Sequence, residues 1–191
     1  MGGTFDPVHV AHLVAAAEAR AALGLDLVLF VVAGSPWQKA GRVHAPADLR
    51  LSMVEASLAG MEGLQASPIE IERGGLTYTA DTLAALAAPE RELFLIVGAD
   101  VAARMDTWVR SREVASLATV VVVERAGEGA ATPPGEGWRV EHVVIPRLDV
   151  SSTDIRRRVA LGLPIDFLVP EPAVRIIRGC GLYTRPDDAG P

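Results

Sequence analysis

The sequence predicts an α/β fold in which helices cover both faces of a mostly parallel sheet. The pattern along the chain is the main reason. Apolar runs rich in β-branched residues alternate with helical segments, and three of these runs are apolar throughout, as in strands buried on both faces. The 191 residues, half of them hydrophobic, are enough for one well-buried core and few for two. Since no internal repeat or linker is evident, residues 1–191 are expected to form a single domain.

The helices and strands are expected in the following order. Asp6 and Pro7 have the residue types of an N-cap and a first helical position, and they begin a predicted helix over residues 8–23 that Gly24 ends. The other predicted helices cover residues 46–58, 79–86, 101–117, 152–160 and 171–178, and the predicted strands cover residues 27–33, 66–72, 93–97, 119–123 and 140–145. Glycine and proline predict an exposed loop over residues 127–137.

The composition excludes several classes of protein. A net charge of -6 disfavours a general nucleic-acid binder, which needs a basic surface to displace counterions. The single cysteine, Cys180, rules out an intramolecular disulfide framework, and no Cys/His set has zinc-ligand spacing. We find no signal-peptide pattern and no apolar run long enough to span a bilayer. We therefore expect a soluble, cytoplasmic protein without a nucleic-acid or membrane partner. The sequence leaves a homo-oligomer open.

Four loop segments are expected to meet in one cleft. They cover residues 2–6, 34–39, 98–100 and 146–152, and each of the last three follows a predicted strand. In open parallel sheets, ligands bind at the carboxyl ends of the strands, where the loops gather. The functional residues are therefore expected within these segments or next to them.

Two histidines stand close together in the first dozen residues, "GGTFDPVHVAH". On a helix, His9 and His12 would lie on one face near the N-terminal end, where unpaired N–H groups and the macrodipole favour an anion. Gly2 and Gly3 would let the backbone approach a ligand closely, and Thr4 adds a hydroxyl donor. Taken alone, a pair of histidines at this spacing is better explained by ordinary surface contacts.

The whole string resembles the G-G-[ST]-F-D-P-x-H-x-G-H signature of the nucleotidyltransferases that share the H-x-G-H motif. Residues 150–156, "VSSTDIR", resemble the I-S-S-T-x-I-R segment of the same family. Between them, "TYTADTL" at residues 77–83, "GAD" at 98–100 and "TW" at 107–108 are similar to the bacterial nicotinate mononucleotide adenylyltransferases. The resemblance covers nearly the whole chain and implies a Rossmann-like fold of the nucleotidyltransferase type.

The resemblance implies transfer of the adenylyl group of ATP to nicotinate mononucleotide, giving deamido-NAD and pyrophosphate. It implies His9, His12 and Arg156 as catalytic residues. It implies ATP contacts for Gly2, Gly3, Thr4, Phe5, Ala11, Asp100, Ser151 and Ser152, and nicotinate mononucleotide contacts for Lys39, Tyr78, Thr79 and Trp108. Mg²⁺ is expected as a cofactor that the ATP phosphates hold, without a carboxylate cage from the protein.

The second motif is also interpretable from its residues. Ser151 and Asp154 have the spacing of a helix start, and Arg156 follows one turn later, so this end of the helix suits an anion. Arg157 and Arg158 are expected on the solvated side of the helix. Lys39, the only lysine beside seventeen arginines, is as compatible with an exposed loop position as with a phosphate contact, and Tyr78 is also compatible with core packing.

Two departures from the family pattern bear on the expectation. Ala11 stands where the family has glycine, and its methyl group is expected to crowd the adenine. Only Met1 precedes Gly2, where the family has a short apolar strand, so the first strand of the sheet is expected to be absent from the chain. Either the start lies upstream, which we favour, or the sheet is compromised.

Alternative functions follow from these departures. Another adenylyltransferase of the same superfamily would act on nicotinamide mononucleotide or phosphopantetheine, and "TYTADTL" with Trp108 argues against both. A nucleotide-binding regulator with weakened catalysis is the alternative from a different class. A dinucleotide-dependent oxidoreductase is disfavoured because no G-x-G-x-x-G motif follows a strand with an acidic residue about 20 positions on.

Overall fold

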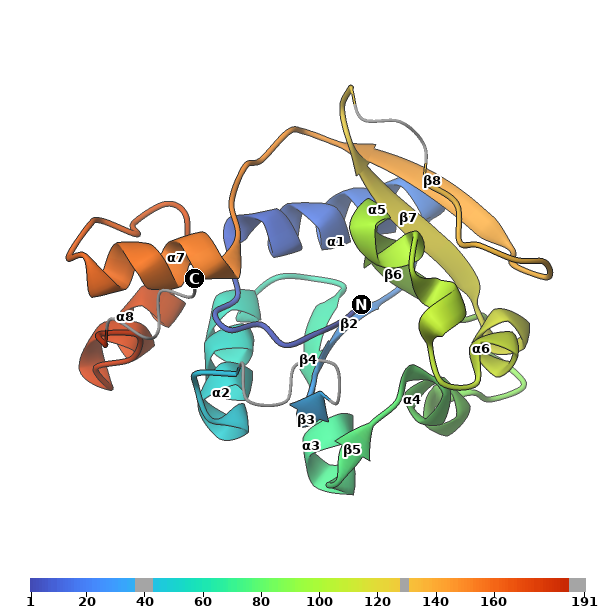
Figure 1. The fold of residues 1–191 in the computed structure, drawn as a ribbon, viewed down its shortest axis with the longest axis horizontal. Coiled ribbons are helices and arrows are strands. Elements are labelled where there is room, and N and C mark those ends of the chain that lie inside the picture. The colour runs from blue at the N-terminus through green and yellow to red at the C-terminus, as the bar shows by residue number, and fades with distance from the viewer. Residues whose placement is uncertain (37–42, 128–130, 186–191) are drawn as a thin grey trace.

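Parallel strands in two groups form the centre of the molecule (Figure 1). The computed structural model describes residues 1–36, 43–127 and 131–185. One group has the order β1 (Gly2–Gly3), β2 (Val28–Val32), β4 (Leu64–Ser67), and the other has the order β6 (Phe94–Gly98), β7 (Thr119–Arg125), β8 (Val140–Ile145). A short pair, β3 (Ser35–Pro36) and β5 (Leu76–Thr77), lies apart. Every strand pair is parallel, which confirms the predicted fold class.

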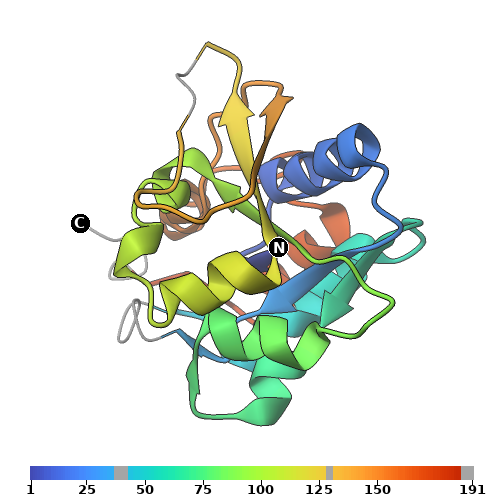
Figure 2. The ribbon, with the colours of Figure 1, turned by 90° about the vertical axis from the view of Figure 1, so that its right-hand side faces the viewer.

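Helices pack on both faces of the second group of strands. The helices are α1 (Val10–Leu23), α2 (Ala47–Leu58), α3 (Ile69–Arg73), α4 (Thr79–Leu86), α5 (Ala99–Ala102), α6 (Ser111–Leu117), α7 (Ser152–Ala160) and α8 (Glu171–Gly179), with a 3-10 turn η2 (Met105–Thr107). α1 contacts β7 and β8, whereas α5 contacts β6 and β7, and α4 packs on α6. Figure 2 shows α1 in blue above and α4 in green below, with strands between them.

The side chains of β7 alternate between two hydrophobic clusters. Val121 and Val123 join the cluster that contains Ala16 and Ala19 of α1. Val120 and Val122 join the cluster that contains residues of α4, α5 and α6. A strand segment that buries successive side chains on opposite faces is apolar at every position, as residues 120–123 of β7 are. The continuous valine run is therefore explained by helices on both faces.

The chain has a first strand, although only two residues long. Gly2 and Gly3 pair with Val31 and Val32 of β2, and the nitrogen of Met1 donates to the carbonyl of Leu29 at 2.9 Å. The expectation that the first strand is absent is therefore wrong as stated. No strand ladder joins β1 to β6 in the described part of the chain, so the parallel strands remain in two groups.

Three local predictions are wrong, the first of them because a tertiary contact decides the local structure. α1 begins at Val10, with His9 and not Asp6 as its N-cap, because the Asp6 carboxylate accepts hydrogen bonds from a distant segment. The predicted strand 66–72 ends at Ser67, and α3 follows after Pro68. The predicted helix 101–117 is divided into α5, η2 and α6, and Arg110 before α6 has a φ of 58°.

Most other elements agree with their predictions. α4, α7 and β8 have the predicted bounds, and Gly24 ends α1 in the left-handed conformation with a φ of 61°. β2, β6, β7, α2 and α8 lie within two residues of the predicted bounds. Within the described ranges, no helix combines the length and the apolar character that crossing a membrane requires.

Candidate active site

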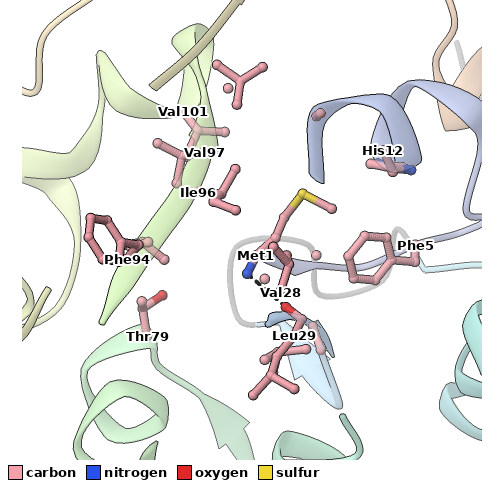
Figure 3. Close-up of a pocket in the computed structure, with 18 of the residues that line it drawn as sticks. Met1, Phe5, His12, Val28, Leu29, Thr79, Phe94, Ile96, Val97 and Val101 are labelled. Atoms are coloured by element: carbon pink, nitrogen blue, oxygen red, sulfur yellow. Dashed lines mark hydrogen bonds between the residues drawn. The ribbon is translucent and has the colours of Figure 1, made fainter. Parts of the chain in front are cut away.

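A large cavity opens at the carboxyl ends of the strands. Its volume is about 1790 Å³, and segments 2–6, 98–101 and 150–153 line it together with α1. The volume exceeds that of a usual small-molecule site. The excess arises because the cavity continues between β2 and β6, where Val28, Leu29 and Phe94 line it and Met1 lies between the strands (Figure 3). Three of the four loop segments therefore share the expected cleft, which has an apolar extension that the sequence did not predict. Residues 34–36 of the fourth segment do not line it, and residues 37–39 lie outside the described residues.

The loop between β1 and α1 forms one wall of the cavity. Its residue Phe5 is buried, with a φ of 50°, and its ring meets the His12 ring edge-on with 5.1 Å between centroids. A Cβ atom at Gly3 would lie 2.8 Å from the Phe5 ring, so this position requires glycine. Gly2 has open space instead. The Phe5 ring thus packs against the His12 ring, and Thr4 and Gly2 line the cavity.

His9 and His12 lie against each other, as their spacing predicts. Their rings stack with centroids 3.7 Å apart, and both residues line the cavity. The backbone N–H of His9 donates to Nδ1 of His12 at 3.2 Å, so that nitrogen carries no proton and a neutral His12 ring has its proton on Nε2. His9 is only 6% exposed, and its buried Nδ1 has no hydrogen-bond partner among the described residues.

Burial determines the charge of His9. Desolvation lowers the pKa of His9 from about 6.5 to about 4, so its ring is neutral at pH 7. A neutral imidazole can still donate one hydrogen bond to a phosphate oxygen. His9 can therefore donate a hydrogen bond from a buried position, but it carries no positive charge at pH 7.

The lowered pKa of His9 predicts that the protein loses stability in mild acid. The unfolded chain binds a proton at His9 below pH 6.5, and the folded chain binds it only near pH 4. The stabilising difference is thus complete above pH 6.5 and is lost as the pH falls. Between about pH 7 and about pH 5, His9 alone should lower the free energy of unfolding by about 2 kcal/mol. Urea unfolding at several pH values measures this decrease.

The control for this measurement is His9→Gln, which has no titrating ring. Its free energy of unfolding should decrease less over the same pH range, whatever its value at pH 7. Equal slopes in the variant and the parent would contradict the assignment of the acid sensitivity to His9.

The second motif lies beside the first. Ser151 caps α7, and its Oγ accepts from the Asp154 N–H at 3.0 Å, as the spacing predicts. Ser152 Oγ donates to the Pro7 carbonyl at 2.9 Å, and Arg156 donates to the Asp6 carbonyl at 2.8 Å. The two motifs, about 145 positions apart, thus form one hydrogen-bonded unit. Arg156 and His12 line the same cavity, so both motifs can contact one ligand there.

The three arginines of α7 differ as predicted. Arg156 is buried and also donates to the Thr153 hydroxyl at 3.2 Å. Arg157 is exposed, and Arg158 donates to the Pro164 carbonyl at 2.9 Å, away from the cavity. Only the arginine at the motif position is therefore available to the site.

The residues expected on the acceptor side also line the cavity. Tyr78 is the N-cap of α4, Thr79 is its first residue, and Trp108 follows η2. Tyr78 and Trp108 are half-buried, and Trp108 also packs against the hydrophobic cluster that contains residues of α4, α5 and α6. Asp100 lies at the rim, 80% exposed, and its carboxylate is 3.7 Å from the Arg104 guanidinium.

Two further expected residues have different outcomes. Ala11 lies on α1, half-buried, and lines the cavity. Lys39 falls outside the described residues, so its predicted role stays a prediction. In the described parts of the chain, no group of three or more histidine, cysteine, aspartate or glutamate side chains could hold a metal ion.

Three buried polar residues beneath the site were missed by the sequence analysis. They are Asp6, Arg50 and Tyr183. The Arg50 guanidinium donates to the carbonyls of Thr4 at 2.6 Å, Ala45 at 3.1 Å and Gly34 at 3.3 Å. Burial lowers the pKa of Arg50, and the negative charge of Asp6 opposes this effect. Only the motif aspartate carried a sequence signal, and it was interpreted as a helix cap.

The chain matches known proteins over nearly its full length. A family model described as cytidylyltransferase-like matches residues 1–158. Among solved structures, the nicotinic acid mononucleotide adenylyltransferase of Plasmodium falciparum complexed with NaAD superposes with a TM-score of 0.79 and 17% identity, over 95% of this chain and 94% of that chain. This likeness supports the fold.

The sequence relatives are closer. A protein of Saccharopolyspora erythraea named "Probable nicotinate-nucleotide adenylyltransferase" is 45% identical over 191 residues, covering 99% of this chain and 90% of its own length. A protein of the same name from Streptomyces coelicolor is 46% identical over 188 residues, covering 96% of this chain and 98% of its own length. Both motifs of the site lie within the matched residues. The chain therefore belongs to the nicotinate-nucleotide adenylyltransferases, a family of the cytidylyltransferase-like proteins.

Proposed function

We propose that the protein transfers the adenylyl group of ATP to the phosphate of nicotinate mononucleotide, forming deamido-NAD and pyrophosphate in NAD biosynthesis. One observation carries the proposal most directly. The loop that bears the stacked histidines is hydrogen-bonded to the start of α7, so donors from both ends of the chain line one cavity. Both reactants are polyanions, and such an array of donors suits them.

The reaction needs alignment and charge neutralisation more than covalent help. An oxygen of the mononucleotide phosphate attacks the α-phosphorus of ATP, a new P–O bond forms, and the bond to the bridging oxygen of the β-phosphate breaks. The electron pair leaves with pyrophosphate. In this proposal His9 and His12 donate hydrogen bonds to the ATP phosphates, and Arg156 supplies a fixed positive charge. Ser151, Ser152, Gly2, Gly3 and Thr4 complete the nucleotide side of the cavity.

Mg²⁺ would enter this site with ATP. The polar groups around the phosphate region are imidazoles, hydroxyls and a guanidinium, which suit phosphate oxygens better than a bare cation. The Asp6 carboxylate is occupied by three hydrogen bonds from the protein. We therefore expect phosphate oxygens and water to hold the ion, which neutralises charge between the phosphates.

The acceptor would bind where α4 begins. The side chain of Tyr78, the N-cap residue, does not cap α4, and the first N–H groups of this helix would serve an anion such as the nicotinate carboxylate. Trp108 and Tyr78 offer aromatic faces for the pyridine ring. An amide acceptor would gain less from backbone donors than a carboxylate, which favours the acid.

An acceptor assay tests the proposal. The protein is incubated with ATP and Mg²⁺ together with nicotinate mononucleotide, nicotinamide mononucleotide or phosphopantetheine, and pyrophosphate and the adenylylated product are measured. The nicotinate compound should react with the highest kcat/KM. A higher kcat/KM for either other acceptor would replace the proposed substrate, and no turnover with any acceptor would favour the regulator.

Ala11→Gly tests whether the added methyl group weakens ATP binding. The Ala11 side chain lines the cavity beside His12, so its removal should lower the KM for ATP several-fold if the methyl crowds the adenine. Glycine in a helix should also cost about 1 kcal/mol of stability. Steady-state kinetics and thermal unfolding measure both effects. An unchanged KM would mean that the adenine does not approach this methyl group.

A further inference from the structure

Asp6 is the centre of a buried hydrogen-bond cluster beneath the candidate site. Its Oδ1 accepts from the Tyr183 hydroxyl at 2.7 Å and from the Ala45 N–H at 3.1 Å, and its Oδ2 accepts from the His44 N–H at 2.8 Å. Tyr183 lies 177 positions after Asp6 in the sequence, and it is 3% exposed. The cluster thus joins the first loop of the chain to its last described segment.

The same loop is held through its backbone carbonyls. Arg50 of α2 binds the carbonyl of Thr4, and Arg156 and Ser152 of α7 bind those of Asp6 and Pro7. Two helices that are distant in sequence therefore hold three carbonyls of one loop. A loop tied at so many points has one conformation, and that conformation sets the direction in which His9 enters the cavity.

The loop needs such support because its backbone is not relaxed. Phe5 has a φ of 50°, in the left-handed region that an aromatic residue rarely adopts. Conformations of this kind persist only when the surrounding structure enforces them, and they concentrate at functional sites. Tyr183 itself has a φ of 61°, so the segment that carries the hydroxyl is also held in an uncommon conformation.

We infer that Tyr183 is a positioning residue of the reaction: its hydroxyl fixes the Asp6 carboxylate, and through it the loop that places His9 and His12 in the phosphate site. Tyr183 does not line the cavity and has no contact with the reacting atoms. The inference rests on the proposed function for its kinetic test, and on the structure alone for its structural test.

The donor role of Tyr183 is chemically consistent. Burial and the negative charge of Asp6 both raise the pKa of the Tyr183 hydroxyl. The hydroxyl therefore stays protonated and donates a hydrogen bond to the carboxylate. A hydrogen bond between a neutral donor and a buried carboxylate is stronger than one between neutral groups. A phenyl ring without the hydroxyl would fill the same space but would not hold the carboxylate.

Tyr183→Phe removes this one hydroxyl and keeps the ring. The variant should lower kcat about tenfold, because small displacements of catalytic groups reduce rates steeply. The KM values for both substrates should stay within about twofold, since the donors act mainly on the transition state. Amide hydrogen exchange at His44 and Ala45, whose N–H groups share the Asp6 carboxylate, should become about tenfold faster.

Ile177→Val is the matched control. Ile177 is fully buried in α8, shortly before Tyr183, and losing one methyl group loosens the packing there but keeps the hydroxyl. This variant should keep kcat and the exchange rates within about twofold of the parent. Thermal unfolding of both variants verifies that each is folded at the assay temperature.

The outcomes separate this inference from the proposed function. A slower kcat and faster exchange in Tyr183→Phe, with neither in Ile177→Val, supports the positioning role. Parent-like kcat in Tyr183→Phe, or equal effects of both variants, overturns it. If the parent protein makes no deamido-NAD, the proposed function fails, and the exchange rates alone decide: faster exchange only in Tyr183→Phe supports the inference, and any other result overturns it.

Discussion

Replacing His12 with asparagine should lower kcat by a factor of 10² to 10³, in the range of other preorganised donors to a developing charge. The substitution separates the two nitrogens of the ring. Asparagine can place an amide atom near the position of Nδ1 and accept the His9 N–H, which holds the start of α1. It cannot reach the position of Nε2, the ring nitrogen proposed to donate to the ATP phosphates. The helix start should therefore survive while the reaction slows.

The measurement is a single-turnover rate with saturating ATP, together with the midpoint of thermal unfolding. His142→Asn is the matched control, because His142 lies on β8, bonds to Glu124 at 2.6 Å and does not line the cavity. The control should keep its rate within about twofold. A rate for His12→Asn within about threefold of the parent would remove His12 from the catalytic residues.

The predictable part of the structure is the part that local chemistry decides. Ser151 caps α7 because a serine three residues before Asp154 meets a free N–H wherever this helix begins. His9 and His12 meet because residues three apart on a helix start share a face. The continuous valines of β7 imply burial on both faces whatever the neighbours are. Each of these inferences depends on a few adjacent residues.

The unpredicted part depends on partners far along the chain. Asp6 has the sequence signature of an N-cap, yet its carboxylate binds groups 38 to 177 positions away. Arg50 lies in a helix rich in apolar and charged residues, where no local feature marks it as buried. The short strands β3 and β5 have two residues each and exist only because they pair with each other. Long-range pairing of this kind leaves no periodic trace in a single sequence.

Arg156→Met should be the second most damaging single change at the site. Methionine has a similar length but no charge, so the cavity loses its fixed positive group and the buried Asp6 carbonyl loses a donor. The unpaired carbonyl should cost about 1 to 3 kcal/mol of stability. The loss of charge should lower kcat/KM for ATP by a factor on the order of 10² or more. Steady-state kinetics and urea unfolding measure the two effects separately.

The neighbouring arginine gives the control, because Arg157 lies on the same helix with its side chain 61% exposed. Arg157→Met should leave kcat/KM and the free energy of unfolding close to the parent values. Equal losses in both variants would show that α7 responds to any lost charge, and Arg156 would have no special role.

Arg156→Lys then separates the charge from the hydrogen bonds. Lysine keeps the positive charge, but a single ammonium cannot reproduce the planar fork that binds the Asp6 carbonyl and the Thr153 hydroxyl together. If the main role of Arg156 is to hold the loop, the lysine variant should resemble methionine in both rate and stability. If its main role is to neutralise the phosphates, lysine should recover most of the rate while the stability stays low. Because Arg156 is proposed to supply positive charge to the ATP phosphates, we expect the second result.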